Sequence, residues 1–385
     1  MSDPRQTSAD HEKIEIRRGI IPDPRPDKAL PVKKDRQRPV FVSSRRRRIP
    51  PWLIAALVFA ALMAGLFLVA PRISDSTLGF EVTPDPGETL PPGWEDYLYG
   101  EDVALVAVGT APVYGQPDAA TVRIGEALLN ERVLMLDTGD RVFIHVRLDD
   151  GLTGYIKREH LTADTSSLSP ENRVAKVVVR TPFKRVMSHA RSGSLVVEAP
   201  MGTILYADYR NGDLLRVRLP GQEPGWINTS GVMLLPPLSA IPQGEPLGQL
   251  LVATVMAFYD SPLIPGGATK RGISPQGAIH VAGLLHGLNL SRDPSLLAGQ
   301  GEAVVLTRDE EGKPDLMAAQ EGDVIFFHGT GDPRLIDSLA MRVADDQLLL
   351  VLSGKSTLRL LDIESKSADE LKERIMTVRR FQKSP

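Results

Sequence analysis

The order of apolar and polar residues divides the chain into regions of different periodicity. Residues 52–70 form one continuous apolar run without a charged side chain. Short runs rich in β-branched residues, separated by Gly and Asp, occur between 103 and 163 and again between 173 and 236. Beyond residue 248, helical and strand periodicities alternate. This pattern predicts one transmembrane helix, two small all-β barrels and a C-terminal α+β domain.

The apolar run reads WLIAALVFAALMAGLFLVA and is long enough to cross a bilayer as a helix. Four arginines at 45–48 precede it, whereas the next twenty residues contain Arg72 as their one basic residue. The positive-inside bias therefore predicts a single-pass helix at 50–71 with a cytoplasmic N-terminus. A cleaved signal peptide is disfavoured because its basic N-terminal region would be 48 residues long, and the apolar run is too continuous for a buried core helix.

Charge separates the N-terminal region from the rest of the chain. Residues 1–48 hold 14 Lys and Arg against 7 Asp and Glu, a net charge of +7, so the remainder carries −10 of the total −3. This basic, Pro-rich region predicts a disordered cytoplasmic tail, and the absence of aromatic interleaving gives no reason to expect nucleic-acid binding. Residues 72–100 contain two Pro-Gly clusters and are predicted to be a Pro-rich linker.

The two β-rich segments, 101–165 and 173–236, form a degenerate internal repeat. Each contains a strand, a Gly-bearing turn and then a Gly-aromatic-Ile sequence, which is Gly154-Tyr155-Ile156 in the first copy and Gly225-Trp226-Ile227 in the second. The predicted strands of the two copies lie at 103–108, 132–136, 141–148, 154–156, 202–206, 214–219 and 225–227.

This pattern resembles bacterial SH3-like (SH3b) domains, in which a late Gly-aromatic-Ile/Val strand follows a turn. Such modules commonly bind cell-wall peptides or pack against an enzyme domain. The resemblance implies that Tyr155 and Trp226 are ligand-binding candidates. A role as barrel-core aromatics remains the alternative for both.

After a Pro-bearing linker at 237–247, the region 248–383 shows a mixed pattern. Residues 250–259 and 275–288 have helical periodicity, and residues 322–327, 335–343 and 347–352 have strand periodicity. Three motifs follow in order: Pro262-Leu263-Ile264-Pro265-Gly266-Gly267, Gly272-Ile273-Ser274-Pro275-Gln276-Gly277 and Gly322-Asp323-Val324-Ile325-Phe326-Phe327.

These motifs resemble the NlpC/p60 family, which are papain-like cysteine peptidases that cut peptidoglycan stem peptides. Family members carry Pro-Tyr-x-Trp-Gly-Gly, Gly-x-Asp-Cys-Ser-Gly, Gly-Asp-Leu-x-Phe-Phe and His-Val-Gly-Ile-Tyr in the same order. The resemblance implies a papain-like α+β fold of the NlpC/p60 type, preceded by SH3-like barrels, in a bacterial envelope protein.

The same alignment implies that the catalytic triad is lost. The nucleophilic Cys corresponds to Pro275, the general base to Ser338 and the third polar residue to Leu352, and the chain contains no cysteine at all. The family's Asp that pairs with the peptide amine corresponds to Ser274. Because loss of a nucleophile or base costs roughly 10⁶-fold in rate, the resemblance predicts a pseudoenzyme.

Other chemistry has weaker support. Ser274 is the nearest hydroxyl that could replace the thiol, with His280 or His286 on the following predicted helix, but a Ser before a helix is more often a cap. The seven histidines show no metal-ligand spacing, and no Gly-rich phosphate loop is present. We therefore expect no metal and no cofactor.

The sequence thus predicts a membrane-anchored, non-catalytic protein of the bacterial inner membrane, with its folded domains in the periplasm or otherwise outside the cytoplasm. Its expected partners are the membrane and either peptidoglycan or an envelope protein, and it would position or regulate a cell-wall hydrolase. Two alternatives stay open: a peptidoglycan hydrolase with a relocated, Ser-type active site, and a structural component whose domains only pack on each other.

Overall fold

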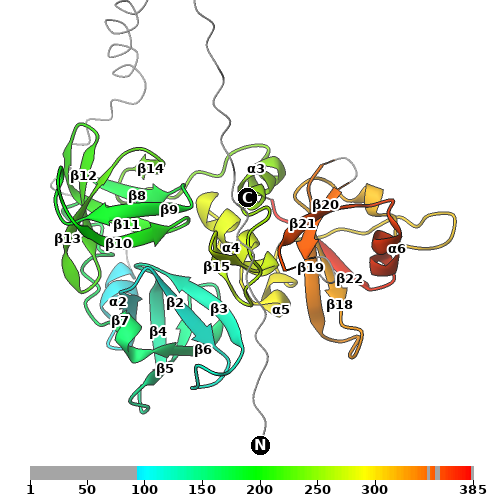
Figure 1. Cartoon of the computed structure of the whole chain (residues 1–385), viewed down its shortest axis with the longest axis horizontal. Helices are drawn as coiled ribbons and strands as arrows, with labels where there is room; N and C mark the ends of the chain where they lie inside the picture. The colour runs from blue at the N-terminus through cyan, green and yellow to red at the C-terminus, as the bar shows by residue number, and fades with distance from the viewer. Residues whose placement is uncertain (1–92, 345–346, 352–355, 383–385) are drawn as a thin grey trace, which may run out of the picture. The chain divides into compact units, whose positions relative to one another are not determined.

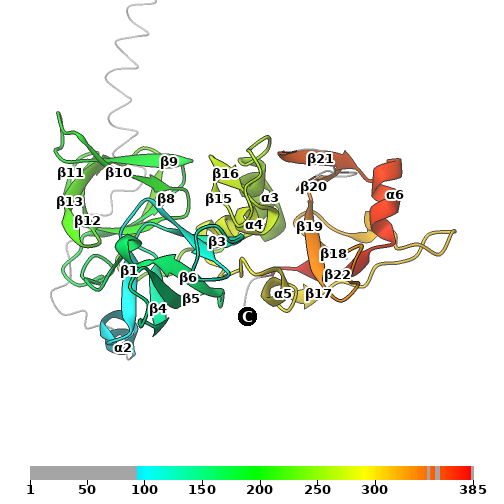
Figure 2. The same ribbon diagram turned by 60° about the horizontal axis from the view of Figure 1, so that its bottom comes forward.

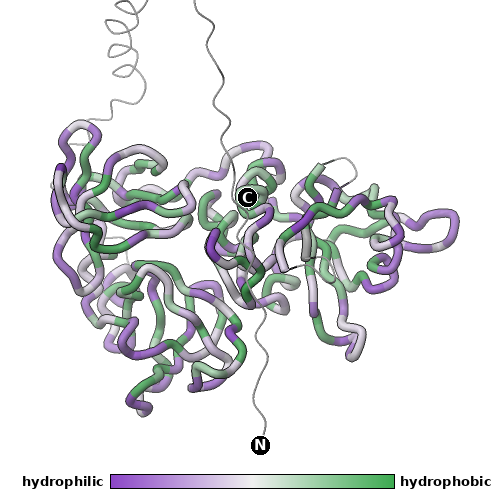
Figure 3. The backbone as a smooth tube through the Cα atoms, viewed as in Figure 1, coloured by the Kyte–Doolittle hydropathy of each residue, from purple (hydrophilic) through white to green (hydrophobic). Residues whose placement is uncertain are grey.

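The computed structural model describes residues 93–344, 347–351 and 356–382 (Figure 1). The predicted tail at 1–48, the apolar run and most of the Pro-rich linker at 72–100 lie outside these residues. The described chain is mostly β-sheet with few helices. Figure 3 shows apolar residues along the strands and helices, with polar residues in many of the connecting loops.

The predicted membrane-spanning fold class is corrected by the structure. Of the described residues, none forms a helix that is long and apolar enough to cross a bilayer. The longest described helix, α4 (Pro275–Leu285), has 11 residues, which is about 16 Å of helix against a hydrocarbon core of about 30 Å. The run at 52–70, on which the prediction rested, lies outside the described residues. The single-pass topology and the inner-membrane location are therefore withdrawn.

The first β domain is a seven-stranded antiparallel sheet preceded by the short helix α2 (Trp94–Tyr99). Its strand order is β3-β2-β6-β5-β4-β1-β7. Inward-facing aliphatic residues, including Val113, Val146 and Ile156, form its core. The strands are β1 (Val103–Val106), β2 (Thr110–Tyr114), β3 (Arg123–Leu128), β4 (Arg132–Asp137), β5 (Phe143–Leu148), β6 (Thr153–Lys157) and β7 (Leu161–Thr162), with the 3₁₀ turn η1 (Arg158–His160) before β7.

The second β domain repeats this topology. Its strand order is β10-β9-β13-β12-β11-β8-β14, which is the order of the first sheet with each number raised by seven. The predicted aromatic residues occupy equivalent positions, because Tyr155 of β6 pairs with Tyr114 of β2 and Trp226 of β13 pairs with Met187 of β9. The strands are β8 (Ala175–Val179), β9 (Phe183–Met187), β10 (Leu195–Pro200), β11 (Ile204–Asn211), β12 (Leu214–Leu219), β13 (Gln222–Asn228) and β14 (Val232–Leu235).

The C-terminal domain is built on a six-stranded antiparallel sheet of order β17-β22-β18-β19-β20-β21, with α3 and α4 against one face and α6 against the other (Figure 2). Its helices and turns are α3 (Leu247–Met256), α4, α5 (Pro294–Leu297), η2 (Leu316–Ala318) and α6 (Lys366–Lys372). The sheet strands are β17 (Glu302–Ala303), β18 (Val324–His328), β19 (Ile336–Arg342), β20 (Gln347–Val351), β21 (Leu358–Asp362) and β22 (Ile375–Arg380), and β15 (Ala268–Thr269) pairs separately with β16 (Gly272–Ile273).

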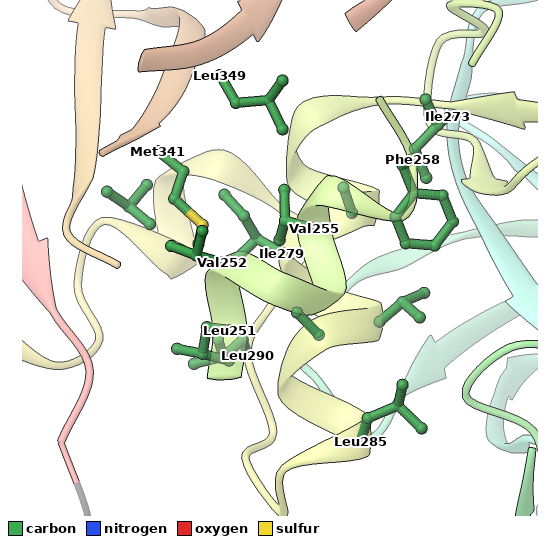
Figure 4. Packing of buried hydrophobic residues seen from close by; sticks show 14 of the residues in the cluster. Leu251, Val252, Val255, Phe258, Ile273, Ile279, Leu285, Leu290, Met341 and Leu349 are labelled. Carbon is green, nitrogen blue, oxygen red and sulfur yellow. The ribbon is translucent and has the colours of Figure 1, made fainter. Parts of the chain in front are cut away.

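The core of this domain lies between its helices and the sheet. Figure 4 shows Val252 of α3 and Ile279 of α4 packed close together, with Met341 of β19 on the sheet side. The opposite sheet face has its own core, which includes Phe327 and Ala368 of α6. The sheet and α3 thereby hold the N-terminal end of α4 in a fixed position.

Candidate functional site

The N-terminus of α4 is the position where the sequence places a lost nucleophile. Ser274 is the N-cap: its hydroxyl accepts a hydrogen bond from the Gly277 amide at 3.1 Å and donates one to the Gly267 carbonyl at 3.0 Å. Pro275 occupies the first helical turn, where its missing N–H costs nothing because that N–H has no intrahelical partner. With 2 % of its surface exposed, Ser274 is a buried helix cap.

A pocket of about 220 Å³ lies beside this helix end and brings together residues that are distant in sequence. Ser274 and Pro275 line it from α4, and Ser338 lines it from β19. The remaining lining residues are Leu263, Pro265, Gln276, Pro294, Ile336, Asp337 and Leu339. The structure therefore places two of the three positions aligned with the triad around one pocket. The third, Leu352, lies outside the described residues.

One lining residue of the pocket, Asp337, forms an ion pair that the sequence did not reveal. Arg374 Nη2 donates to both carboxylate oxygens of Asp337, at 2.7 and 2.9 Å, and the Ser338 hydroxyl donates to Asp337 Oδ1 at 2.9 Å. The Asp337 side chain is 45 % exposed. Asp337 and Arg374 are 37 residues apart, so no local motif indicates their pairing. The Ser338 hydroxyl is thus directed at a carboxylate.

Neither candidate histidine is hydrogen-bonded to Ser274 in the described part of the chain. The buried His280 directs Nδ1 to the Leu290 carbonyl at 2.6 Å, and His286 Nε2 lies 3.0 Å from the Thr254 hydroxyl. Burial lowers the pKa of His280 to about 3, with Arg292 adding to this effect and Asp150 opposing it. Within the described residues, the Ser274 hydroxyl is hydrogen-bonded to two backbone groups and not to a base that could activate it as a nucleophile.

The first β domain contacts the loop that borders this pocket. Arg123 Nε donates to the Pro265 carbonyl at 2.8 Å, and Glu126 Oε2 accepts a hydrogen bond from the Ala268 amide at 2.8 Å. Gly266 has a φ of +65°, and a Cβ at this position would lie 2.4 Å from the Gly125 amide nitrogen. Only glycine permits this close approach of two backbones.

The two aromatic candidates have different surroundings. The Tyr155 ring stacks on His145 with a centroid distance of 4.7 Å. Trp226 lies 6.0 Å from the Tyr209 ring in an edge-on arrangement and lines an open pocket of about 510 Å³. Lys184, Arg185 and His189 line the same pocket, so this pocket combines an aromatic side chain with basic side chains.

A buried charge network joins the first β domain to the C-terminal domain. Arg292 Nε donates to Asp150 Oδ2 at 2.7 Å, and its Nη2 is paired with Glu131 Oε1. Burial raises the pKa of the Asp150 carboxyl, but the charge of Arg292 and the hydrogen bonds that Arg292 donates outweigh this effect, and the net pKa is lowered. In the described residues, no three His, Asp or Glu side chains are grouped as metal ligands.

No protein-family model matches the chain. Over 233 residues the chain is 23 % identical to the dipeptidyl-peptidase 6 of Lysinibacillus sphaericus, covering 59 % of this chain and 82 % of that protein. It also resembles the crystal structure of an NlpC/P60 family protein from Bacillus cereus, with a TM-score of 0.60, 18 % identity, and coverage of 72 % of this chain and 99 % of that one.

The extent of this structural likeness reaches beyond the C-terminal domain. That domain occupies about a third of the 385 residues, whereas the likeness to the Bacillus cereus protein covers 72 % of the chain. The matched region must therefore include residues that precede the C-terminal domain. The described chain has the fold of an NlpC/P60 peptidase-like protein.

Proposed function

We propose that this protein binds cell-wall peptides without cleaving them, and that the pocket at the N-terminus of α4 is where it does so. The observation that carries the proposal is that the chain has no cysteine and that Pro275 occupies the position aligned with the thiol. Cysteine peptidases of this fold require a thiolate at that helix end. Without it the fold retains a pocket but loses the attacking group.

The polar groups of the pocket suit recognition of a peptide amine. Three hydrogen bonds from Arg374 and Ser338 occupy part of the acceptor capacity of Asp337, and its exposed side retains room for a further donor. Leu263, Ile336 and Leu339 supply apolar walls. An ammonium group against Asp337 and a small aliphatic side chain against these walls match the chemistry of a short wall peptide.

The β domains support association with the wall polymer. They resemble SH3b modules, and the pocket beside Trp226 combines an aromatic surface with the basic groups Lys184 and Arg185. Such a surface fits an extended, anionic peptide or glycan segment. A protein that holds wall material without cutting it would position or regulate a separate hydrolase, and an envelope protein is the alternative partner.

The test is a paired binding and cleavage assay on the purified full-length protein. We expect the protein to sediment with insoluble peptidoglycan and to release no new amino groups from it. Asp337→Asn should weaken binding of soluble stem peptides about tenfold, while Glu310→Gln on an exposed loop should leave binding unchanged. Amino-group release that is lost in Ser274→Ala would establish a serine hydrolase instead, and failure to sediment would favour a protein partner.

A second experiment asks whether the missing thiol is sufficient to explain the loss of catalysis. In Pro275→Cys, we expect a thiol at a helix N-terminus, which thiol-specific reagents will modify, but no hydrolysis, since no histidine lines the pocket in the described chain. Measurable hydrolysis by Pro275→Cys alone would contradict this expectation. Ser365→Cys, at the cap of α6, is the control for thiol reactivity.

A further inference from the structure

A second cavity lies where three parts of the chain meet, away from the pocket at the α4 N-terminus. It has a volume of about 350 Å³, within the range of small-molecule sites. The first β domain, the second β domain and the α4 region all line it. A Cβ at Gly202 of the second domain would lie 3.3 Å from both Leu128 and Leu284, so the walls approach closely there.

The acidic side chains and the arginines that line this cavity are hydrogen-bonded to one another. Arg292 is bound to Asp150 and Glu131, while Arg132 Nη1 donates to Asp149 Oδ1 at 2.7 Å. Three carboxylates therefore face two guanidinium groups, which leaves a formal charge of −1. An anion would meet net repulsion at this site, whereas a neutral or cationic molecule would not.

Two buried polar atoms in the cavity wall have no hydrogen-bond partner in the described chain: His280 Nε2 and Thr203 Oγ1. Both residues line the cavity and are 1 % exposed. An unpaired buried polar atom costs free energy, so most such atoms in proteins have partners. Two of them on the wall of one cavity suggest that a bound molecule supplies the missing partners.

The tautomer of His280 determines what that molecule must offer. Nδ1 lies 2.6 Å from the Leu290 carbonyl and 3.6 Å from Asp150 Oδ2, and both oxygens can only accept. Nδ1 therefore carries the hydrogen, and Nε2 of the neutral ring presents a lone pair. The ligand must donate to Nε2, while the Thr203 hydroxyl can accept or donate. The rest of the wall is mainly aliphatic, with Ile204, Leu284 and Leu288 among its residues.

From this geometry we propose that the cavity binds a small molecule with an apolar body, a neutral or positive charge and a hydrogen-bond donor that reaches His280 Nε2. Because the walls come from three parts of the chain, such a ligand joins the two β domains to the α4 region. This site is independent of the proposed wall-peptide pocket.

The test uses three probes that share an indole body and differ in charge: neutral tryptophol, cationic tryptamine and anionic indole-3-acetate. Calorimetric titration of the full-length protein should give saturable binding of tryptophol and tryptamine, with indole-3-acetate at least about tenfold weaker. Thr203→Val preserves shape and removes the hydroxyl, and it should weaken tryptophol binding about three- to tenfold.

Two further variants make the result specific to the cavity. Thr229→Val removes a hydroxyl that donates to Asp213 on the same domain, outside the cavity, and should leave binding unchanged. Leu288→Phe fills the cavity and should abolish binding. Absence of saturable binding by all three probes, equal affinity for the anionic probe, or equal effects of the two threonine variants would overturn the proposal. None of these readouts depends on cell-wall material, so they are separate from the test of the proposed function.

Discussion

At the scale of single residues, the buried Arg292 links two parts of the described structure. It is 1 % exposed, and its guanidinium contacts Asp150, Glu131 and the Glu126 carbonyl, all of which belong to the first β domain. Buried charges are tolerated only when they are paired and hydrogen-bonded. Arg292 is therefore both an ion-pair partner and a link between two domains.

Replacement of Arg292 by Met should destabilise the protein by about 3–5 kcal/mol, because Asp150 and Glu131 would remain buried without their counter-charge. The free energy of unfolding from urea titration measures this effect. Arg334→Met is the control, since Arg334 pairs with Asp332 at the surface and its loss should have no measurable effect. Equal stability of the Arg292 variant and the wild type would contradict this account of the network.

Protonation of His280 should make stability depend on pH. Its pKa is lowered to about 3 in the folded protein, against about 6.5 in an unfolded chain, so the unfolded state binds the proton first. The contribution of His280 is fully present above about pH 6.5 and is lost as the pH falls toward 3, by up to about 1.4 kcal/mol per pH unit.

The measurement is urea unfolding at intervals between pH 7.5 and 4.5. His280→Gln removes this titration and should flatten the slope relative to the wild type, while His160 and His286, whose pKa values are also lowered, keep their own contributions in both proteins. The same slope in both proteins would show that His280 is not buried in its neutral form.

At the scale of elements, the start of α4 follows directly from local chemistry. Ser274 before Pro275 predicts a helix beginning at Pro275, and the helix begins there. Its end differs from the predicted residue 288, because the helix ends at Leu285 and Gly287 then adopts a φ of +68°. The glycine offers a left-handed conformation that ends the helix earlier than the apolar pattern indicates.

Ser274→Ala should lower the free energy of unfolding by about 1–2 kcal/mol. It removes a buried hydroxyl that accepts a hydrogen bond from the Gly277 amide and donates one to the Gly267 carbonyl. Ser365→Ala is the matched control, because Ser365 caps α6 by accepting from the Ala368 amide at a more exposed site. We expect a smaller loss, about 0.5–1 kcal/mol. Thermal and urea unfolding of both variants measure the difference, and a larger cost for Ser365→Ala would contradict the role assigned to burial.

At the scale of the whole molecule, the first β domain and the C-terminal domain contact each other through backbone atoms as well as through charged side chains. The Gly125 and Gly266 backbones meet closely, and Glu126 satisfies the Ala268 amide. Both contacts lie next to the pocket at the α4 N-terminus, whose wall includes Pro265. Domain packing therefore sets the shape of that pocket.

Gly266→Ala should separate these two domains, because the added Cβ would lie 2.4 Å from the Gly125 nitrogen in addition to the strain of a positive φ. Gly312→Ala is the control: it has a similar φ of +79° but nothing within 4 Å of the added atom. We expect Gly266→Ala to lower the free energy of unfolding by at least about 2 kcal/mol more than Gly312→Ala does. Its unfolding curve should also show more than one transition. Equal losses would show that only backbone strain matters at Gly266.

The sequence predicted regular elements better than it predicted contacts. The strand predicted at 335–343 is observed as Ile336–Arg342, and the helix predicted at 250–259 is observed as Leu247–Met256. Strands β21 and β22 were not predicted, because Leu358–Asp362 and Ile375–Arg380 mix charged and apolar residues and become strands only by pairing with neighbours. The Asp337–Arg374 pair was missed because it joins a sheet strand to the segment before another strand.

The amino-acid sequence by itself determined what chemistry is unavailable. A chain without cysteine cannot present a thiolate, and Ser274-Pro275 fixes a capped helix start where the nucleophile is expected, because composition and capping are local properties. The local pattern also indicated the duplicated β domains. Only the tertiary structure decided which distant groups meet: Asp337 with Arg374, Arg292 with Asp150 and Glu131, and Thr203 with His280 around one cavity. Burial and pairing across domains depend on the packed fold, which no local pattern encodes.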